Sequence, residues 1–168
     1  MNTYEHICQP FEPVFDKDSR ILILGSLPSV RSREQGFYYG HPRNRFWRLV
    51  ADLVNKPEPE SIEEKKALLL SSHIAVWDVI KECDIIGSSD QSIKNAVAAD
   101  IRPLLESTDI KAVFLNGSAA GRLYERYIMP QVDICAVTLP STSPANAAWS
   151  FERLCEKWQS EIGKYLNK

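Results

Sequence analysis

The sequence predicts an α/β protein, a three-layer α/β/α sandwich with a central, mainly parallel four-stranded sheet. Short apolar runs without polar alternation are typical of strands that are buried on both faces of a parallel sheet. Segments with the helical repeat lie between these runs, so that strands and helices alternate as they do in βαβ units. The 168 residues fit one compact domain. We therefore expect a single domain over residues 1–168.

Four apolar, largely β-branched runs supply the expected strands. At least two of these runs are directly followed by Gly, Ser or Pro, which is a common way for a strand to end. The expected strands are residues 20–25, 74–80, 111–116 and 133–139.

The segments between and after these strands have apolar residues three and four positions apart, which predicts helices. One of them opens with Ser61 and has Glu64 three residues later, the pattern of a capping box. Asp90 is expected to be the N-cap of another, which begins near Ile93. The expected helices are residues 44–54, 61–70, 93–105, 119–128 and 147–166.

Composition excludes several classes of protein. The hydrophobic fraction of 44% and the charged fraction of 25% are ordinary for a globular protein. The first twenty residues do not form a signal peptide, and no apolar run is long enough to span a membrane. The four Cys and three His lack the spacing of metal ligands. We expect a cytoplasmic monomer with free thiols, no metal and no cofactor.

The charge of the chain is unevenly distributed. A net charge of −2 argues against a broad basic surface for nucleic acid. Residues 31–48, however, contain five Arg and a single acid, Glu34. A basic rim of this kind suits a protein that touches a few phosphates, whereas the alternative is a solvated helix start with incidental charge.

Two loops rich in Gly, Ser and Pro follow expected strands. The first starts as G-S-L-P-S at 25–29 and continues to Trp47, and the second is L-P-S-T-S-P-A-N at 139–146. Because parallel strands end at the same edge of a sheet, we expect the loops to face each other across one cleft. That geometry predicts an active site.

Several residue types in these loops fit binding or catalysis. Gly25 lets backbone approach a ligand, and the amides that follow, from Ser26 on, can hold an anion or polarise water. The three aromatic residues at 37–39 cannot all face one core, so some should line a cavity whose flat walls suit a stacked base. Asn44 stands at an expected helix start, where it would serve as the N-cap.

Two further features lie at the same expected edge. Asp78 follows Trp77 at the end of a strand and is either an acceptor for a base edge or a cap. The hydroxyls and amides of the 139–146 loop can press on a phosphate backbone. Dinucleotide-binding, P-loop and Ser-His-Asp patterns are absent.

Three sequence motifs together resemble the hypoxanthine-DNA (deoxyinosine) glycosylases of the uracil-DNA glycosylase superfamily. They are G-S-L-P-S at 25–29, F-Y-Y-G-H-P-R-N-R-F-W at 37–47 and L-P-S-T-S-P-A-N at 139–146. In that superfamily the first loop handles water, and the second presses on DNA while the damaged base is flipped into the pocket. The resemblance covers residues from about 20 to 158.

The resemblance implies roles for individual residues. This chain has Ser26 and Leu27 where many members place an Asp or Asn, so Asn44 becomes the candidate for the main catalytic group. Asp78 falls where relatives have an Asn that reads the base edge. The catalytic residues implied are Asn44, Ser26 and Gly25, and the base-binding residues are Tyr39, Asp78, Leu27 and Pro28.

The second loop departs from the superfamily pattern. The His that many relatives have there is missing, with Leu139 or Thr142 near its place, and small residues replace the bulky wedge. We expect a slow enzyme, because a strong general base is absent. The implied DNA-binding residues are Ser141, Ser143, Pro144, Asn146, Arg31 and Arg43.

These features predict a monofunctional DNA glycosylase that acts on DNA containing a deaminated base and excises hypoxanthine, with uracil as a second candidate substrate. It is monofunctional because no loop Lys is placed to attack the sugar. One alternative is a uracil-specific glycosylase with a narrower pocket. The other is a non-catalytic module that binds nucleotides or damaged DNA, and the missing catalytic carboxylate is its best support.

Overall fold

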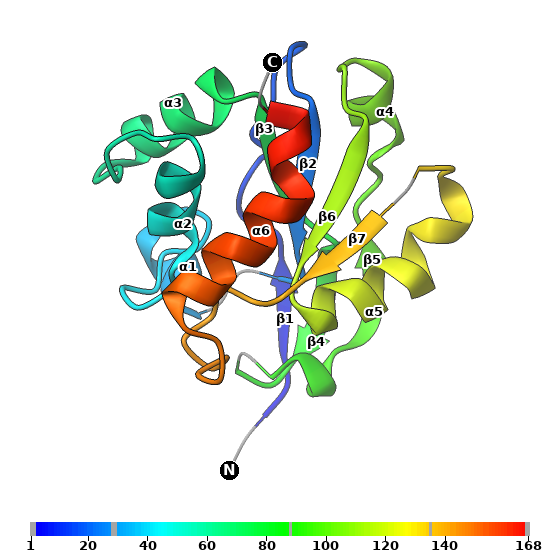
Figure 1. Ribbon diagram of the computed structural model, residues 1–168. Helices are drawn as coiled ribbons and strands as arrows, with labels where there is room; N and C mark the ends of the chain where they lie inside the picture. The colour runs from blue at the N-terminus through cyan, green and yellow to red at the C-terminus, as the bar shows by residue number, and fades with distance from the viewer. Residues whose placement is uncertain (1–2, 28–29, 88, 135, 167–168) are drawn as a thin grey trace.

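The computed structural model describes residues 3–27, 30–87, 89–134 and 136–166, and of Val30 and Arg31 only the backbone. A four-stranded, fully parallel sheet lies at the centre, in the order β3-β2-β6-β7 (Figure 1). Its strands are β2 (Ile21–Gly25), β3 (Ile74–Asp78), β6 (Ala112–Asn116) and β7 (Ala136–Leu139). The predicted fold class is confirmed.

Both faces of this sheet are buried, which explains the continuous apolar runs. In β2, Ile21 and Ile23 belong to one core cluster, and Leu22 and Leu24 belong to the other. All four side chains are fully buried. Successive side chains of a strand point to opposite faces, so a strand that is covered on both sides has no position for a polar residue.

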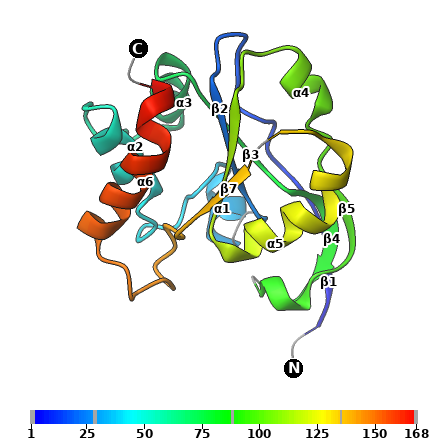
Figure 2. The same cartoon turned by 45° about the vertical axis from the view of Figure 1, so that its right-hand side comes forward.

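Helices form the outer layers. Figures 1 and 2 show α2, α3 and α6 on one side of the central sheet and α4 and α5 on the other. Ser61 caps α3 by accepting from the Glu64 amide at 3.0 Å, as the capping box predicts. The helices are α1 (Val30–Gln35), α2 (Phe46–Leu53), α3 (Ile62–Ser71), α4 (Arg102–Glu106), α5 (Ser118–Tyr127) and α6 (Phe151–Leu166), with 3-10 turns η1 (Asp90–Ser92) and η2 (Met129–Gln131).

A second, three-stranded antiparallel sheet was not predicted. Its order is β1-β4-β5, with β1 (Glu5–Cys8), β4 (Ile80–Ile85) and β5 (Lys94–Ala98). The chain turns from β3 into β4 because the amides of Val79 and Ile80 bond to the carbonyls of Gly25 and Ser26. The expected strand 74–80 therefore ends at Asp78.

The predicted helix over residues 93–105 is wrong, and Asp90 does not cap it. Residues 94–98 form strand β5, with Asn95 at a positive φ of 53°, and a helix starts only at Arg102. Pro103 occupies the first turn of α4, where its missing N–H costs nothing, whereas in the middle of a longer helix it would break a hydrogen bond. Of the apolar residues of β5, Ala96 and Ala98 pack against the core and Val97 is exposed, while the backbone pairs with β4.

Within the described residues, no helix combines the length and apolar character that crossing a lipid bilayer requires.

Candidate active site

A cavity of about 740 Å³ opens at the carboxyl edge of the central sheet. It is lined by loops that follow β2, β3, β6 and β7, and both loops singled out in the sequence contribute to it. Of the predicted site residues, those that line it are Gly25, Ser26, Leu27, Tyr39, Asn44, Asp78, Ser141, Ser143 and Asn146.

The other four predicted residues are not among the lining side chains. Pro28 lies outside the described residues, as does the side chain of Arg31 in α1. Arg43 is exposed, and its amide bonds to His41 Nδ1 at 3.0 Å. Pro144 is half-buried within the second loop.

Asn44 is joined to the second loop through a buried hydroxyl. Its Oδ1 accepts from the Phe46 amide at 2.9 Å and from Thr142 Oγ1 at 2.7 Å. The prediction that Asn44 is the N-cap is wrong by one residue, because α2 begins at Phe46 and Arg45 is its N-cap. The bond to the Phe46 amide instead closes a turn just before the helix. Because a backbone N–H can only donate, it fixes which atom of the amide is oxygen. The amide nitrogen, Nδ2, is left to act as a donor.

Thr142 also connects Asn44 to the end of β6. Asn116 Nδ2 donates to Thr142 Oγ1 at 3.0 Å, and the Thr142 amide donates to Asn116 Oδ1 at 3.0 Å. Thr142 is fully buried, so these bonds replace all of its contact with water. The three residues form a rigid polar network across the cleft.

Arg45 holds the second loop in place rather than facing a phosphate. Its guanidinium donates to the carbonyls of Ser143 at 3.0 Å and Asn146 at 3.1 Å, and to that of Trp149. The Arg45 backbone amide donates to Thr142 O at 3.1 Å. A planar fork of several donors can organise many carbonyls at once, which a Lys could not.

Tyr39 supplies a flat wall to the cavity. Its ring stacks on Phe46 with centroids 4.0 Å apart and planes at 22°, whereas Phe37 and Tyr38 are buried in the core. The backbone of Tyr39 has a positive φ of 52°, an uncommon conformation for an aromatic residue, which turns the ring away from its two neighbours. Burial raises the pKa of the Tyr39 hydroxyl, with Asp78 contributing further.

Asp78 is a buried carboxyl group in the cavity wall, with 3% of its surface exposed. Gln9 Nε2 donates to its Oδ2 at 2.5 Å, and Gln9 Oε1 accepts from the Phe11 amide at 2.9 Å, so the orientation of the Gln9 amide is fixed. Burial raises the pKa of Asp78 from 3.8 to about 7, although the bond from Gln9 lowers it. Both protonation states are therefore populated near neutral pH.

Gly25 is required by close packing. A Cβ at this position would lie 2.6 Å from Asp78 Oδ1 and 3.1 Å from the Tyr39 hydroxyl oxygen. The side chains of Asp78 and Tyr39 thus press against the bare backbone at the end of β2.

At the rim, Ser26 Oγ donates to Asp90 Oδ1 at 3.2 Å. Desolvation raises the pKa of Asp90, while the bond from Ser26 and the charge of Arg122 lower it. Asp90 lines the cavity, a placement that sequence reasoning missed.

Gln9, Asn116 and Thr142 were also not identified as site residues. The strand-then-turn pattern of Asn116-Gly117-Ser118 could have pointed to Asn116, since it repeats that of the first loop. Gln9 has no such signal, because it reaches Asp78 only through the pairing of β1 with β4.

The fold and the cleft define an α/β protein with a cavity at the carboxyl edge of a parallel sheet, which is where proteins of this class bind ligands. The family model of the uracil DNA glycosylase superfamily matches residues 12–162, and the chain belongs to that superfamily.

Similar proteins come from two species of the genus Methanosarcina. The hypoxanthine DNA glycosylase of Methanosarcina acetivorans is 36% identical over 152 residues, which cover 89% of this chain and 94% of the relative. The hypoxanthine DNA glycosylase of Methanosarcina barkeri is 36% identical over 121 residues, which cover 67% of this chain and 73% of that relative. A solution NMR structure from M. acetivorans, described as a candidate uracil DNA glycosylase, has a TM-score of 0.77 and 36% identity, covering 89% of this chain and 92% of that one.

Proposed function

We propose that this protein is a monofunctional DNA glycosylase that hydrolyses the N-glycosidic bond of deoxyinosine in DNA and releases hypoxanthine. Two named hypoxanthine DNA glycosylases support the reaction class. The observation that carries the proposal is the cleft itself, where an aromatic wall, a buried carboxyl group and a fixed amide donor meet.

The base is held between the aromatic wall and Asp78. Tyr39, already stacked on Phe46, presents a flat surface on which a flipped base can stack. The Asp78 carboxylate accepts from N1–H of hypoxanthine, whereas adenine has a bare acceptor at N1 and is repelled. This difference distinguishes deoxyinosine from its parent nucleoside.

Asn44 stabilises the charge that builds up on the departing base. The transition state resembles an oxocarbenium ion, with negative charge moving onto the purine. Since Oδ1 of Asn44 is used by Phe46 and Thr142, its Nδ2 can donate to an acceptor atom of the purine. The network through Thr142 positions this donor before the substrate arrives.

Water completes the reaction. Its oxygen forms a bond to C1′ as the C1′–N9 bond breaks, and a proton from the water ends on the released base. The Gly25–Ser26 loop at the end of β2 orients this water through its amides. No Lys is among the described residues that line the cleft, which agrees with direct hydrolysis rather than attack by an amine.

DNA is held by the second loop. Ser141, Ser143 and Asn146 lie on the cleft wall, where hydroxyl and amide groups can contact phosphates. Because Arg45 fixes the carbonyls of this loop, it positions these groups without touching DNA. Arg43 is exposed, directly precedes Asn44 of the cleft wall, and supplies a charged phosphate contact.

The test is a single-turnover incubation with duplexes that contain inosine, uracil, xanthine or only normal bases, followed by alkali to cleave abasic sites. Strand breaks at inosine support the proposal. Breaks at uracil alone would change the substrate, since the Asp78 carboxylate can also accept from N3–H of uracil. Absence of breaks in a folded protein that still binds the duplex would favour a binding module.

A further inference from the structure

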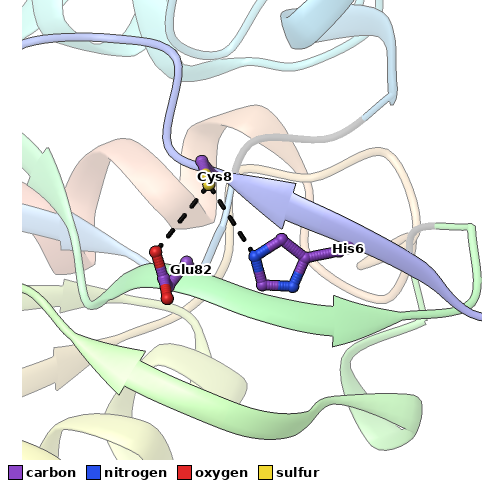
Figure 3. Close-up of side chains that lie close together, drawn as sticks. All are labelled: His6, Cys8 and Glu82. Atoms are coloured by element: carbon purple, nitrogen blue, oxygen red, sulfur yellow. Dashed lines mark hydrogen bonds between the residues drawn. The ribbon is translucent and has the colours of Figure 1, made fainter.

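A group of three metal-ligand side chains lies on the three-stranded sheet, on strands separate from the cleft loops. His6 and Cys8 are two residues apart on β1 and therefore point to the same face. Cys8 is paired with Glu82 of β4, and Figure 3 shows the three side chains converging between the strands. Cys8 Sγ lies 3.9 Å from His6 Nε2 and 3.8 Å from Glu82 Oε2.

The ligand atoms of this group are already close to metal-binding geometry. The sulfur, the nitrogen and a carboxylate oxygen all lie within 4.8 Å of one another. Ligands around a tetrahedral zinc ion, at ~2.0–2.3 Å from the metal, are separated by roughly 3.3–3.6 Å. Movement of side chains alone closes the difference, because His6 is 57% exposed and Cys8 is exposed as well.

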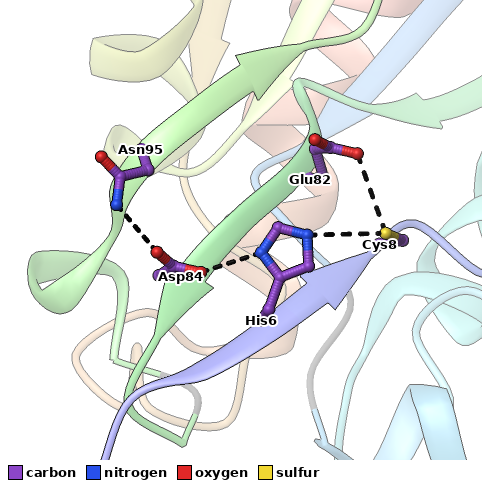
Figure 4. Close-up of polar contacts among 5 residues, drawn as sticks. All are labelled: His6, Cys8, Glu82, Asp84 and Asn95. Atoms are coloured by element: carbon purple, nitrogen blue, oxygen red, sulfur yellow. Dashed lines mark hydrogen bonds and ion pairs between the residues drawn. The ribbon is translucent and has the colours of Figure 1, made fainter.

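The ring of His6 is oriented from behind by a chain of hydrogen bonds (Figure 4). Its Nδ1 lies 2.8 Å from Asp84 Oδ1, and Asn95 Nδ2 of β5 donates to Asp84 Oδ2 at 2.8 Å. A carboxylate on the far nitrogen of a His ligand fixes its tautomer and directs Nε2 at a metal.

We propose that His6 Nε2, Cys8 Sγ and Glu82 Oε2 bind a divalent transition-metal ion of the zinc class. Thiolate, imidazole and carboxylate are the ligand set that zinc takes in proteins, and three protein ligands leave a fourth position for water. Binding removes the thiol proton of Cys8 to solvent.

The same residues could be read as a Cys-His-Asp nucleophile, but Glu82 argues against it. A carboxylate 3.8 Å from the sulfur repels a thiolate, which is the reactive form. In this structure the Cys8 thiol donates to Glu82 Oε2. Once that proton leaves, a divalent cation between the two groups would attract both of them.

The ion would tie β1 to β4 next to the cleft. Gln9 directly follows β1, bonds through its amide to Lys81 O at 2.6 Å, and holds Asp78 through its side chain. The metal site is independent of the proposed reaction, but it would stabilise the strand that positions Gln9. The sequence predicted no metal because Glu82 lies 74 residues after Cys8, so the three ligands form no recognisable motif. Strand pairing is what brings Glu82 beside Cys8.

Cobalt reports directly on thiolate ligation. Tag-free protein, stripped with a chelator and kept reduced, is titrated with Co²⁺. One equivalent should produce a thiolate-to-cobalt charge-transfer band with tetrahedral d–d bands, and Zn²⁺ should displace both. Zn²⁺ should also raise the melting temperature of the stripped protein.

Variants identify the ligands. Cys8→Ser and His6→Gln should each remove the charge-transfer band, whereas Cys155→Ser on α6 should retain it. Asp84→Asn should keep the band but weaken affinity by ~10- to 100-fold. Absence of the band in the wild-type protein, or an equal band in Cys8→Ser, would overturn the proposal.

Discussion

Replacing the buried carboxyl of Asp78 by its neutral isostere should stabilise the protein at high pH while impairing excision. The folded protein raises the pKa of Asp78 from 3.8 to about 7 because the ionised group is desolvated. Between these values the folded chain keeps a proton that the unfolded chain has lost. Stability of the wild-type protein therefore falls as pH rises through this window. The Asp78→Asn variant has no such proton to lose.

The size of the effect follows from the same pKa values. One pKa unit corresponds to about 1.4 kcal/mol, so full ionisation of Asp78 costs about 4 kcal/mol of folding free energy above neutral pH. Part of this penalty is already present at pH 5. Between pH 5 and pH 8 the advantage of the Asp78→Asn variant over wild type should grow by about 2.5 kcal/mol.

Urea unfolding of both proteins at pH 5 and pH 8 measures this change. Any constant cost of placing the Asn amide against Gln9 Nε2 is the same at both pH values and cancels in the comparison. Gln9→Ala removes a bond that lowers the pKa of Asp78, so its window should extend to higher pH. An advantage of Asp78→Asn that does not change with pH would refute the reasoning.

Three further substitutions test other parts of the site. Asn44→Asp keeps the oxygen that accepts from the Phe46 amide but loses the amide donor. Single-turnover excision should therefore fall by about 100-fold or more at an unchanged melting temperature, and an undiminished rate would remove Asn44 from the mechanism. In Arg45→Lys the ammonium group cannot bond several loop carbonyls at once, so the free energy of unfolding in urea should fall by ~1–3 kcal/mol. DNA binding, measured by fluorescence titration, should weaken as well. A variant as stable as wild type would contradict the role assigned to Arg45. Gly25→Ala should leave the protein folded but abolish excision, because the new methyl group would displace Asp78 or Tyr39. Excision at the wild-type rate would show that the cleft has room for the methyl group.

The central sheet was predictable because the pattern that marks it is local. The strands β2, β3 and β6 are almost entirely buried, so an unbroken apolar run marks each of them in the sequence, whereas the edge strand β7 is only partly buried. The second sheet carries no such pattern, since β1 buries only Ile7 and β5 has no fully buried residue. These two strands form because they pair with β4. Residues 93–105 have apolar residues at helical spacing, so without knowledge of the partner strand the sequence predicts a helix there.

The cleft was predictable in outline for a related reason. Gly25 and the Ser-rich loop at 139–146 are recognisable as strand ends, and parallel strands bring their ends together. The partners within the cleft were not predictable. Arg45 was read as part of a basic rim, yet its guanidinium bonds loop carbonyls about 100 residues further along the chain. Such bonds depend on the exact approach of two loops.

The sequence by itself determined the fold class, the two loops at one sheet edge, and the resemblance to a glycosylase family. These depend on hydrophobic periodicity and residue types, which act over a few neighbouring positions. Only the tertiary structure decided the raised pKa of Asp78, the bond from Gln9, and the convergence of His6, Cys8 and Glu82. A pKa and a ligand distance depend on desolvation and on atoms from distant segments, and folding alone brings these together.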